Sequence, residues 1–147
     1  MGTEIERKFL VDVDKLKKYA YPKGDDGVLE IEQAYIVSRT DVSVRARITS
    51  NPNLKDAMWY EPTAELGVKL GDGPIRMEFE QEINLSEAED LISQYPSLHK
   101  IRYIFKISGS DRYEIELGDI DEEIELPNWV DEEITYNPEY LNCNLVK

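Results

Sequence analysis

Cysteine and histidine are almost absent from this sequence. Cys143 and His99 are the only residues of these two types among 147. A single cysteine excludes an internal disulfide and a thiolate-rich zinc site, so we interpret Cys143 as an inert, small hydrophobic residue. Nothing accompanies His99 at metal-binding spacing, and we expect it on the surface or in a packing role. Any catalytic site therefore has to be built from other residue types.

Long apolar runs are absent as well. No run approaches the roughly 20 residues that span a bilayer, and no basic, apolar leader stands at the start of the chain. We therefore expect a cytoplasmic protein without a membrane partner. Basic residues are scarce, since 17 Lys and Arg face 31 Asp and Glu for a net charge of −14. This balance disfavours nucleic acid as a partner unless the bases are segregated.

What the sequence contains is enough for one folded domain. Hydrophobic residues make up 41% of the chain, which includes nine tyrosines, and this composition argues against disorder. A chain of this length can bury a core without help from disulfides. No repeat or linker divides it, so we predict a single domain over residues 1–147.

Short segments with period-two alternation dominate the chain and predict strands, because successive residues of a strand point to opposite faces. These segments are 3–11, 29–37, 42–49, 64–70, 75–83, 100–107 and 112–117. We predict helices over 12–20 and 85–95, the second with capping-box spacing between Ser86 and Glu89. A long hairpin loop is expected over 50–63, and the acid-rich stretch 119–133 is expected to cover a sheet edge or close an end. The predicted fold class is mainly β (α+β), with antiparallel strands.

Charged residues recur on one face of six of these strands. The bases are Lys8, Arg45, Arg47, Lys69, Arg76, Lys100 and Arg102, and the acids are Glu4, Glu6, Glu78, Glu80, Glu114 and Glu116. These seven bases and six acids carry a net charge of +1, so the remaining 10 bases and 25 acids carry −15. The bases are thus concentrated on the strand faces.

Two architectures can hold such strands. In an open sheet, helices cover the apolar face and the charged face meets water, where ion pairs contribute about 0 to 1 kcal/mol each. In a closed or nearly closed antiparallel β-barrel, the charged faces line a polar interior, and a few short helices lie outside. Two short helices cover little of six strands, which favours closure, but the pattern alone leaves both architectures open.

The charged faces suit phosphoryl transfer. Cations from several strands can bind a polyanion with multiple phosphates through charge-assisted hydrogen bonds. Glu-x-Glu pairs aim two carboxylates at one region, and Mg²⁺ prefers one or two carboxylates together with water and phosphate oxygens. Phosphoryl transfer needs mostly positioning and charge neutralisation, which this set of residues supplies without cysteine, histidine or a serine triad.

EIERK, residues 4–8, resembles the Glu-x-Glu-x-Lys signature of the CYTH or triphosphate tunnel metalloenzyme superfamily. This superfamily includes inorganic and thiamine triphosphatases, class IV adenylyl cyclases and fungal-type RNA triphosphatases. Further segments are similar to strands of the family in the same order, namely QAYI, VRAR, GVKLG, IRMEFEQEI and KIRY. ELPNWVDEEIT and EYLNCNL resemble the family's ending, so the resemblance spans nearly the whole chain.

The resemblance implies an eight-stranded antiparallel tunnel that binds a linear triphosphate, with the seven bases as phosphate ligands. It implies Mg²⁺ or Mn²⁺ as cofactor, with the six acids as metal ligands. By motif, Lys100 and Tyr35 would activate the attacking water. A lysine can act as a base only if its pKa falls, which the neighbouring positive charge of Arg102 favours.

The activity that the resemblance implies is metal-dependent hydrolysis of the terminal phosphoanhydride bond of a triphosphate. The substrate would be inorganic triphosphate or a small organic triphosphate, such as a nucleoside or thiamine triphosphate. Two alternatives stay open: a class IV adenylyl cyclase, and a catalytically degenerate module that binds nucleotides or polyphosphate. A homodimer is compatible with each of them.

The chain departs from the family pattern in three places. Only the segment 112–117 lies where the family usually has two strands, so one strand is missing and the tunnel is expected to be smaller or incompletely closed. Residues 131–132 are Asp-Glu instead of Gly-Lys, and Glu139 stands where a basic residue is common, which weakens the expected phosphate binding by the ending. The hairpin loop is long and carries Trp59 and Tyr60, which we expect to pack on the barrel rather than to stack on a ligand.

Overall fold

Residues 2–12, 14–15, 20–22, 28–103, 105–107 and 130–140 are described by the structure, a computed structural model. Six strands form an antiparallel sheet in the order β1-β7-β6-β5-β4-β8. They are β1 (Gly2–Ile5), β4 (Val28–Ser38), β5 (Val42–Ser50), β6 (Thr63–Leu70), β7 (Ile75–Glu82) and β8 (Ser97–Tyr103). Strands β4 to β7 pair in chain order, so the middle of the sheet follows the sequence.

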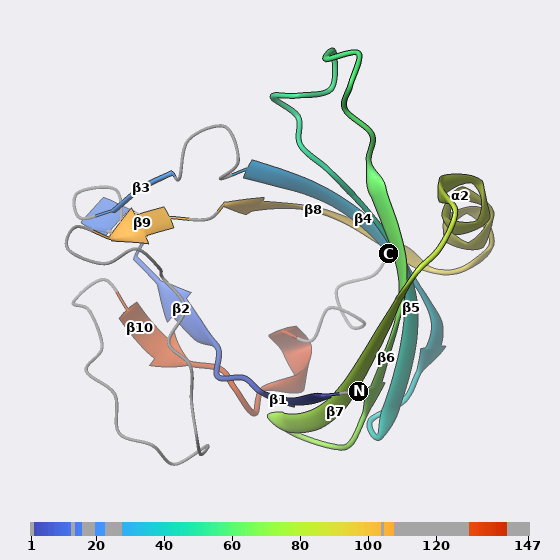
Figure 1. The fold of residues 1–147 in the computed structure, drawn as a ribbon. Coiled ribbons are helices and arrows are strands. Elements are labelled where there is room, and N and C mark those ends of the chain that lie inside the picture. Colours follow the sequence, from blue (N-terminus) through green and yellow to red (C-terminus); the bar gives the residue numbers. More distant parts are fainter. Residues whose placement is uncertain are drawn as a thin grey trace.

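Two smaller strand pairs continue the two edges of this sheet. At one edge, β2 (Phe9–Val11) follows β1 along the chain and pairs with β10 (Val130–Glu133). At the other edge, β9 (Phe105–Ile107) follows β8 and pairs with β3 (Ala20–Pro22). Figure 1 shows that the large sheet is strongly curved and that both pairs lie opposite its middle strands.

The register of the sheet places the charged residues on one face, because directly paired residues of neighbouring strands point to the same side. Arg47 pairs with Gln33 on β4 and with Glu65 on β6. The same side includes residues of both edge strands. Glu4 of β1 pairs with Arg76, and Lys100 of β8 pairs with Ile31, which lies on the same side of β4 as Gln33. We call this side the polar face; its members are Glu4, Gln33, Tyr35, Arg45, Arg47, Glu65, Gly67, Lys69, Arg76, Glu78, Glu80, Lys100 and Arg102.

The opposite, apolar face is covered in part by the helix α2 (Leu85–Gln94), which packs against β4, β5 and β6. Small side chains at this contact are almost fully buried, namely Ala34, Ala46, Ala64 and Ala88. At β7 the apolar face is more open, since Ile75, Met77 and Phe79 are 46%, 40% and 42% exposed. The helix therefore protects only the central strands.

The middle of the polar face is more buried than the β7 end of the apolar face. Gln33 is fully buried, and Arg45 and Arg47 are each 8% exposed. Even a paired charge contributes little net stability when it is buried, because the cost of desolvation offsets the attraction, so an arginine-rich interior is not explained by stability alone. The arrangement differs from the open-sheet expectation, in which the charged face meets water.

Most predicted strands are confirmed. Segments 29–37, 42–49, 64–70 and 75–83 correspond to β4, β5, β6 and β7, and 100–107 covers the end of β8 and all of β9. The predicted strand over 3–11 is interrupted at residues 6–8, where the chain exchanges β7 for β10 as its pairing partner. The pairs formed by β3 and β10 were not predicted, and the strand expected over 112–117 lies outside the described residues.

The helix predictions need correction. The helix over 85–95 is confirmed as α2, but its N-cap is Asn84, whose side chain makes no capping hydrogen bond. Ser86 already lies inside the helix, so the predicted capping box is wrong. The helix expected over 12–20 is confirmed at residues 14–15, falls largely outside the described residues, and does not include Ala20, which belongs to β3.

A short 3-10 helix was not predicted. It spans Pro138–Tyr140 and lies on the inner side of the curved sheet (Figure 1). In the part of the chain that the structure describes, no helix is both long and apolar enough to cross a membrane.

The hairpin loop over 50–63 is confirmed and projects from the sheet between β5 and β6 (Figure 1). Trp59 is 75% exposed and Met58 is fully exposed, so the expectation that Trp59 packs on the barrel is wrong. Its ring contacts that of Tyr60 edge-to-face at 6.3 Å, and the Tyr60 hydroxyl accepts a hydrogen bond from the Asn51 backbone. The loop is held by these contacts and by an ion pair with β4, in which Lys55 Nζ lies 3.1 Å from Glu30 Oε2.

Candidate functional site

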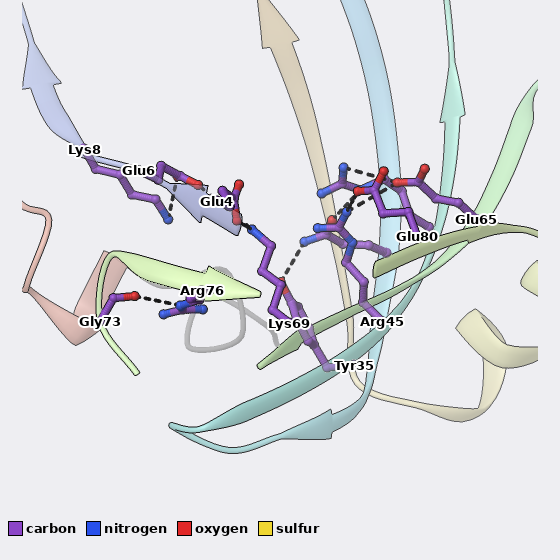
Figure 2. Close-up of polar contacts among 12 residues, drawn as sticks. Glu4, Glu6, Lys8, Tyr35, Arg45, Glu65, Lys69, Gly73, Arg76 and Glu80 are labelled. Atoms are coloured by element: carbon purple, nitrogen blue, oxygen red, sulfur yellow. Dashed lines mark hydrogen bonds and ion pairs between the residues drawn. The ribbon is translucent and has the colours of Figure 1, made fainter. Parts of the chain in front are cut away.

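The amino-terminal signature forms one end of the site. Lys69 lies between two of its acids: the Nζ atom is 2.7 Å from Glu4 Oε2 and 4.0 Å from Glu6 Oε2. Lys8 Nζ is 3.5 Å from the other oxygen of Glu6. Figure 2 shows the side chains of Glu4, Glu6 and Lys8 gathered beside Lys69, as their shared parity predicts. Burial would raise the pKa of Glu6, but the charges of Lys8 and Lys69 outweigh it and hold that pKa below its usual value.

The backbone of Lys8 is fixed by the carboxyl-terminal strand. Its N–H donates to Thr135 Oγ1 at 3.1 Å, and its carbonyl accepts from the Ile134 N–H at 2.8 Å. Next to it, Arg7 points to the other side and makes a bidentate contact with Glu133, the shortest N–O distance being 2.8 Å. The carboxyl-terminal segment around β10 thus positions the signature lysine.

The paired arginines of β5 form the centre of the site. Arg45 Nη2 is 3.1 Å from Glu80 and 3.3 Å from Glu65. Arg47 Nε donates to Gln33 Oε1 at 2.9 Å, and its Nη1 is 3.7 Å from Glu65. Burial and the positive charges of Arg45 and the more distant Arg102 lower the pKa of Arg47 to about 10.

One donor at this centre has no acceptor. Among the described residues, Arg45 Nε is buried and makes no hydrogen bond. Gly67 lies directly beside it, because a Cβ atom built at that glycine would come within 3.2 Å of Arg45 Nε. An unsatisfied buried donor costs about 1–3 kcal/mol, so an acceptor supplied by a ligand would be favoured at this position.

A cavity of about 250 Å³ opens between the signature and the arginines. Six predicted site residues line it: Lys8, Tyr35, Arg45, Lys69, Arg76 and Glu78. Tyr35 accepts a hydrogen bond from Gln33 Nε2 at 3.1 Å, and Arg76 Nε donates to the Gly73 carbonyl at 2.7 Å. Four of these six predicted residues are cationic, and their convergence on one small cavity is what a polyanion ligand requires.

A second, more open hollow of about 250 Å³ is lined by Gly2, Thr3 and three acids, Glu4, Glu78 and Glu80. Burial raises the pKa of Glu78, the ammonium of Lys69 opposes the shift, and the carboxyl groups of Glu80 and Glu4 add to it. Such mutual repulsion of carboxylates is what a bound cation relieves. Within the described ranges, however, no three acidic, histidine or cysteine side chains are close enough together to hold a metal ion.

Lys100 and Arg102 complete the polar face at the β8 edge, beyond the lining of the cavity. Burial lowers the pKa of Lys100 to about 8, and the positive charges of Arg102, Arg47, Arg45 and Lys8 act in the same direction. The predicted influence of Arg102 is confirmed, although burial is the larger cause. Glu114 and Glu116, the remaining predicted metal ligands, lie outside the described residues.

Sequence reasoning missed several residues of the site. Glu65 and Gln33 hold the paired arginines, and their parity with Lys69 and Tyr35 on the same strands could have revealed them. Arg39 lines the cavity from the turn after β4 and is paired with Asp41 at 3.0 Å. Tyr136 lines it from the carboxyl-terminal segment. No periodicity marks these two positions, because they lie outside the strands.

Comparison with known proteins gives a consistent result. No model of a known protein family matches the chain. An inorganic triphosphatase of Acetivibrio thermocellus is 34% identical over 165 aligned residues, which cover 100% of this chain and 95% of the relative. The solved structure of the inorganic triphosphatase NE1496 matches 99% of this chain and 95% of its own with a TM-score of 0.50, and its 23% identity limits that likeness to the fold. The chain belongs to the inorganic triphosphatase family.

Proposed function

We propose that this protein hydrolyses the terminal phosphoanhydride bond of inorganic triphosphate or of a small organic triphosphate. Water attacks the terminal phosphorus, and phosphate and the shortened diphosphate leave. The observation that carries this proposal is the buried Arg45 Nε, which has no acceptor among the described residues, at a cavity lined by five cationic side chains. The named activity of the 34%-identical relative supports it.

We assign the residues of the polar face different roles in the reaction according to their positions. Lys8, Arg45, Lys69 and Arg76 bind phosphate oxygens in the cavity, and Arg47, Lys100 and Arg102 extend the positive charge toward β8. The function of these groups is to hold the chain of phosphates in line and to neutralise charge as it develops. Lys100, with its lowered pKa, takes a proton from the attacking water, and Tyr35 orients that water.

Mg²⁺ or Mn²⁺ is the cofactor that fits the acidic hollow. Its carboxylates are hard oxygen donors, and Mg²⁺ needs only one or two of them, because water and phosphate oxygens complete its shell. This requirement agrees with a hollow that three acids line, although no three described acids are close enough together to bind one ion jointly. One or two of Glu4, Glu78 and Glu80 would hold the ion, with Glu6, Glu114 and Glu116 as the further proposed ligands. When bound, the metal would polarise a phosphoryl oxygen and neutralise its charge.

We also propose that the strands close into a tunnel of the CYTH type. The continuation of both sheet edges by strand pairs supports closure, as does the burial of the arginine side of the sheet. The alignment with the relative spans 165 residues, 18 more than the 147 of this chain. The relative thus has residues that this chain lacks, which agrees with the missing strand.

The test is incubation of the purified protein with triphosphate, ATP and thiamine triphosphate, with and without Mg²⁺ or Mn²⁺. Phosphate release that depends on the metal supports the proposed hydrolase. Formation of cyclic AMP and pyrophosphate from ATP would instead identify a cyclase. Binding of triphosphate without turnover would identify a non-catalytic module and overturn the proposal.

A further inference from the structure

Lys69 is a proposed phosphate ligand, but its ammonium group is already paired with a proposed metal ligand. As a cation that lines the cavity, it is placed to bind phosphate. Its ammonium is nevertheless engaged with a carboxylate, 2.7 Å from Glu4 Oε2 (Figure 2). Glu4 in turn lines the acidic hollow, where it is placed to bind a metal ion. The same contact therefore occupies both a phosphate ligand and a metal ligand.

The position of Lys69 is that of a counter-ion for a group of acids. Besides Glu4, it lies 4.0 Å from Glu6 and is paired across the sheet with Glu78, whose carboxylate its charge stabilises. The side chains of Lys69 and Glu4 are 20% and 29% exposed, so water screens their contact less than it would at an open surface. One ammonium thus offsets the repulsion among three carboxylates.

We propose that Lys69 occupies the place of the metal ion in the unliganded protein and exchanges partners when the ligands bind. A divalent cation bound by the acids releases the ammonium from Glu4, and the released ammonium binds a phosphate oxygen of the triphosphate. Metal and triphosphate therefore bind with positive coupling that passes through Lys69. This inference rests on the proposed function for the identity of the two ligands.

Other cations of the site are less suited to this exchange. Among the described acids, Lys8 contacts only Glu6, at 3.5 Å, and its side chain is 35% exposed. Arg45 holds Glu80 at 3.1 Å, but it also holds Glu65, which is not among the proposed metal ligands. Release of Glu80 would thus leave Arg45 in place, whereas release of Glu4 frees Lys69 to move.

The coupling can be measured as a thermodynamic cycle by isothermal titration calorimetry. Mn²⁺ is titrated into the protein alone and into its complex with a triphosphate analogue whose bridging oxygens are replaced by imido groups. In the wild type, the analogue should tighten Mn²⁺ binding, and couplings between ligands commonly reach about 5- to 150-fold. In Lys69→Met and Lys69→Gln, Mn²⁺ should bind the protein alone about tenfold more tightly, and the coupling should fall well below the wild-type value, leaving only the part that direct coordination of the analogue's phosphate oxygens supplies.

Two variants control this experiment. Arg39→Gln removes one positive charge from the same cavity at a side chain paired with Asp41 rather than with the metal-binding acids, so it should change Mn²⁺ affinity little. Lys69→Arg keeps the counter-charge and should restore affinity toward the wild-type value. Far-ultraviolet circular dichroism and unfolding midpoints establish that each variant is folded.

If Mn²⁺ affinity rose equally in Lys69→Met and in Arg39→Gln, the inference would be overturned, because the rise would then be a general effect of removing a positive charge. Unchanged or weakened Mn²⁺ binding in the Lys69 variants, or no Mn²⁺ binding by any variant, would overturn it too. Failure of the proposed function looks different. In that case the wild type would leave triphosphate intact, while Mn²⁺ would still bind more tightly once Lys69 is removed.

Discussion

The pH dependence of hydrolysis is the sharpest consequence of the geometry around Lys100. Its pKa is lowered from 10.5 to about 8 by burial and by positive charge from Arg102, Arg47, Arg45 and Lys8. At pH 7 a lysine with a pKa of 8 is about 9% neutral, whereas one with a pKa of 10.5 is about 0.03% neutral. The neutral amine is the form that accepts a proton, so the site raises its supply about 300-fold.

The expected result follows from the sign of this shift. Because deprotonation activates the base, kcat/KM should rise tenfold per pH unit below about pH 8 and level off above it. The inflection of kcat should lie at higher pH, since bound phosphates stabilise the charged amine. Arg102→Met removes a neighbouring positive charge and should move the kcat/KM inflection upward. Both constants are measured as metal-dependent phosphate release from triphosphate between pH 6 and 10.

The control for this profile is Lys100→Arg, which keeps the positive charge but cannot lose its proton in this range. The substrate and metal-bound water still ionise in this variant, so any pH dependence near pH 8 that it retains does not arise from Lys100. A profile for Lys100→Arg with the wild-type inflection and rate would refute the assignment of Lys100 as the base.

Three further predictions follow from single contacts. Gly67→Ala places a methyl group against Arg45 Nε. Triphosphate affinity, measured by calorimetry, should fall about tenfold or more because one charge-assisted hydrogen bond is weakened. The melting temperature should stay level or rise. Arg7→Met should lower the free energy of unfolding by about 1 kcal/mol. A double-mutant cycle with Glu133→Gln, measured by urea unfolding, should show that the two effects are coupled, and additive effects on the free energy would contradict this prediction. Glu6→Gln should reduce metal-supported turnover about tenfold or more with the fold intact, and normal turnover would show that Glu6 is not a metal ligand.

The faces of the strands could be predicted from sequence because parity is a local property. Arg45 and Arg47 alternate with apolar residues on one strand, and no knowledge of neighbouring strands is needed to place them on one side. Once the strands pair in register, residues of the same side necessarily meet, as Arg47 does with Gln33 and Glu65. The shared location of the predicted bases therefore follows from alternation and antiparallel pairing together.

What the sequence could not show depends on contacts between distant segments. Residues 6–8 keep the alternation of a strand, yet the pairing partner changes there from β7 to β10. That change requires β10, which begins at Val130 and is too short to stand out as a pattern. The ion pairs could not be predicted either, because alternation shows the face on which Lys69 lies but not that its ammonium group is 2.7 Å from Glu4.

The distribution of charge also bears on the size of the ligand. The residues other than the seven predicted bases and six predicted acids carry a net −15, and such charge acts over a Debye length of about 8 Å at physiological ionic strength. A long polyanion such as nucleic acid would lie across this acidic surface and be repelled, because it cannot fit within a cavity of about 250 Å³. A triphosphate is short enough to be enclosed among Lys8, Arg45 and Lys69, and a divalent metal ion would lower its charge on the way in. An acidic protein can therefore bind a polyphosphate selectively when the bases are buried together and the acids beside them take the metal.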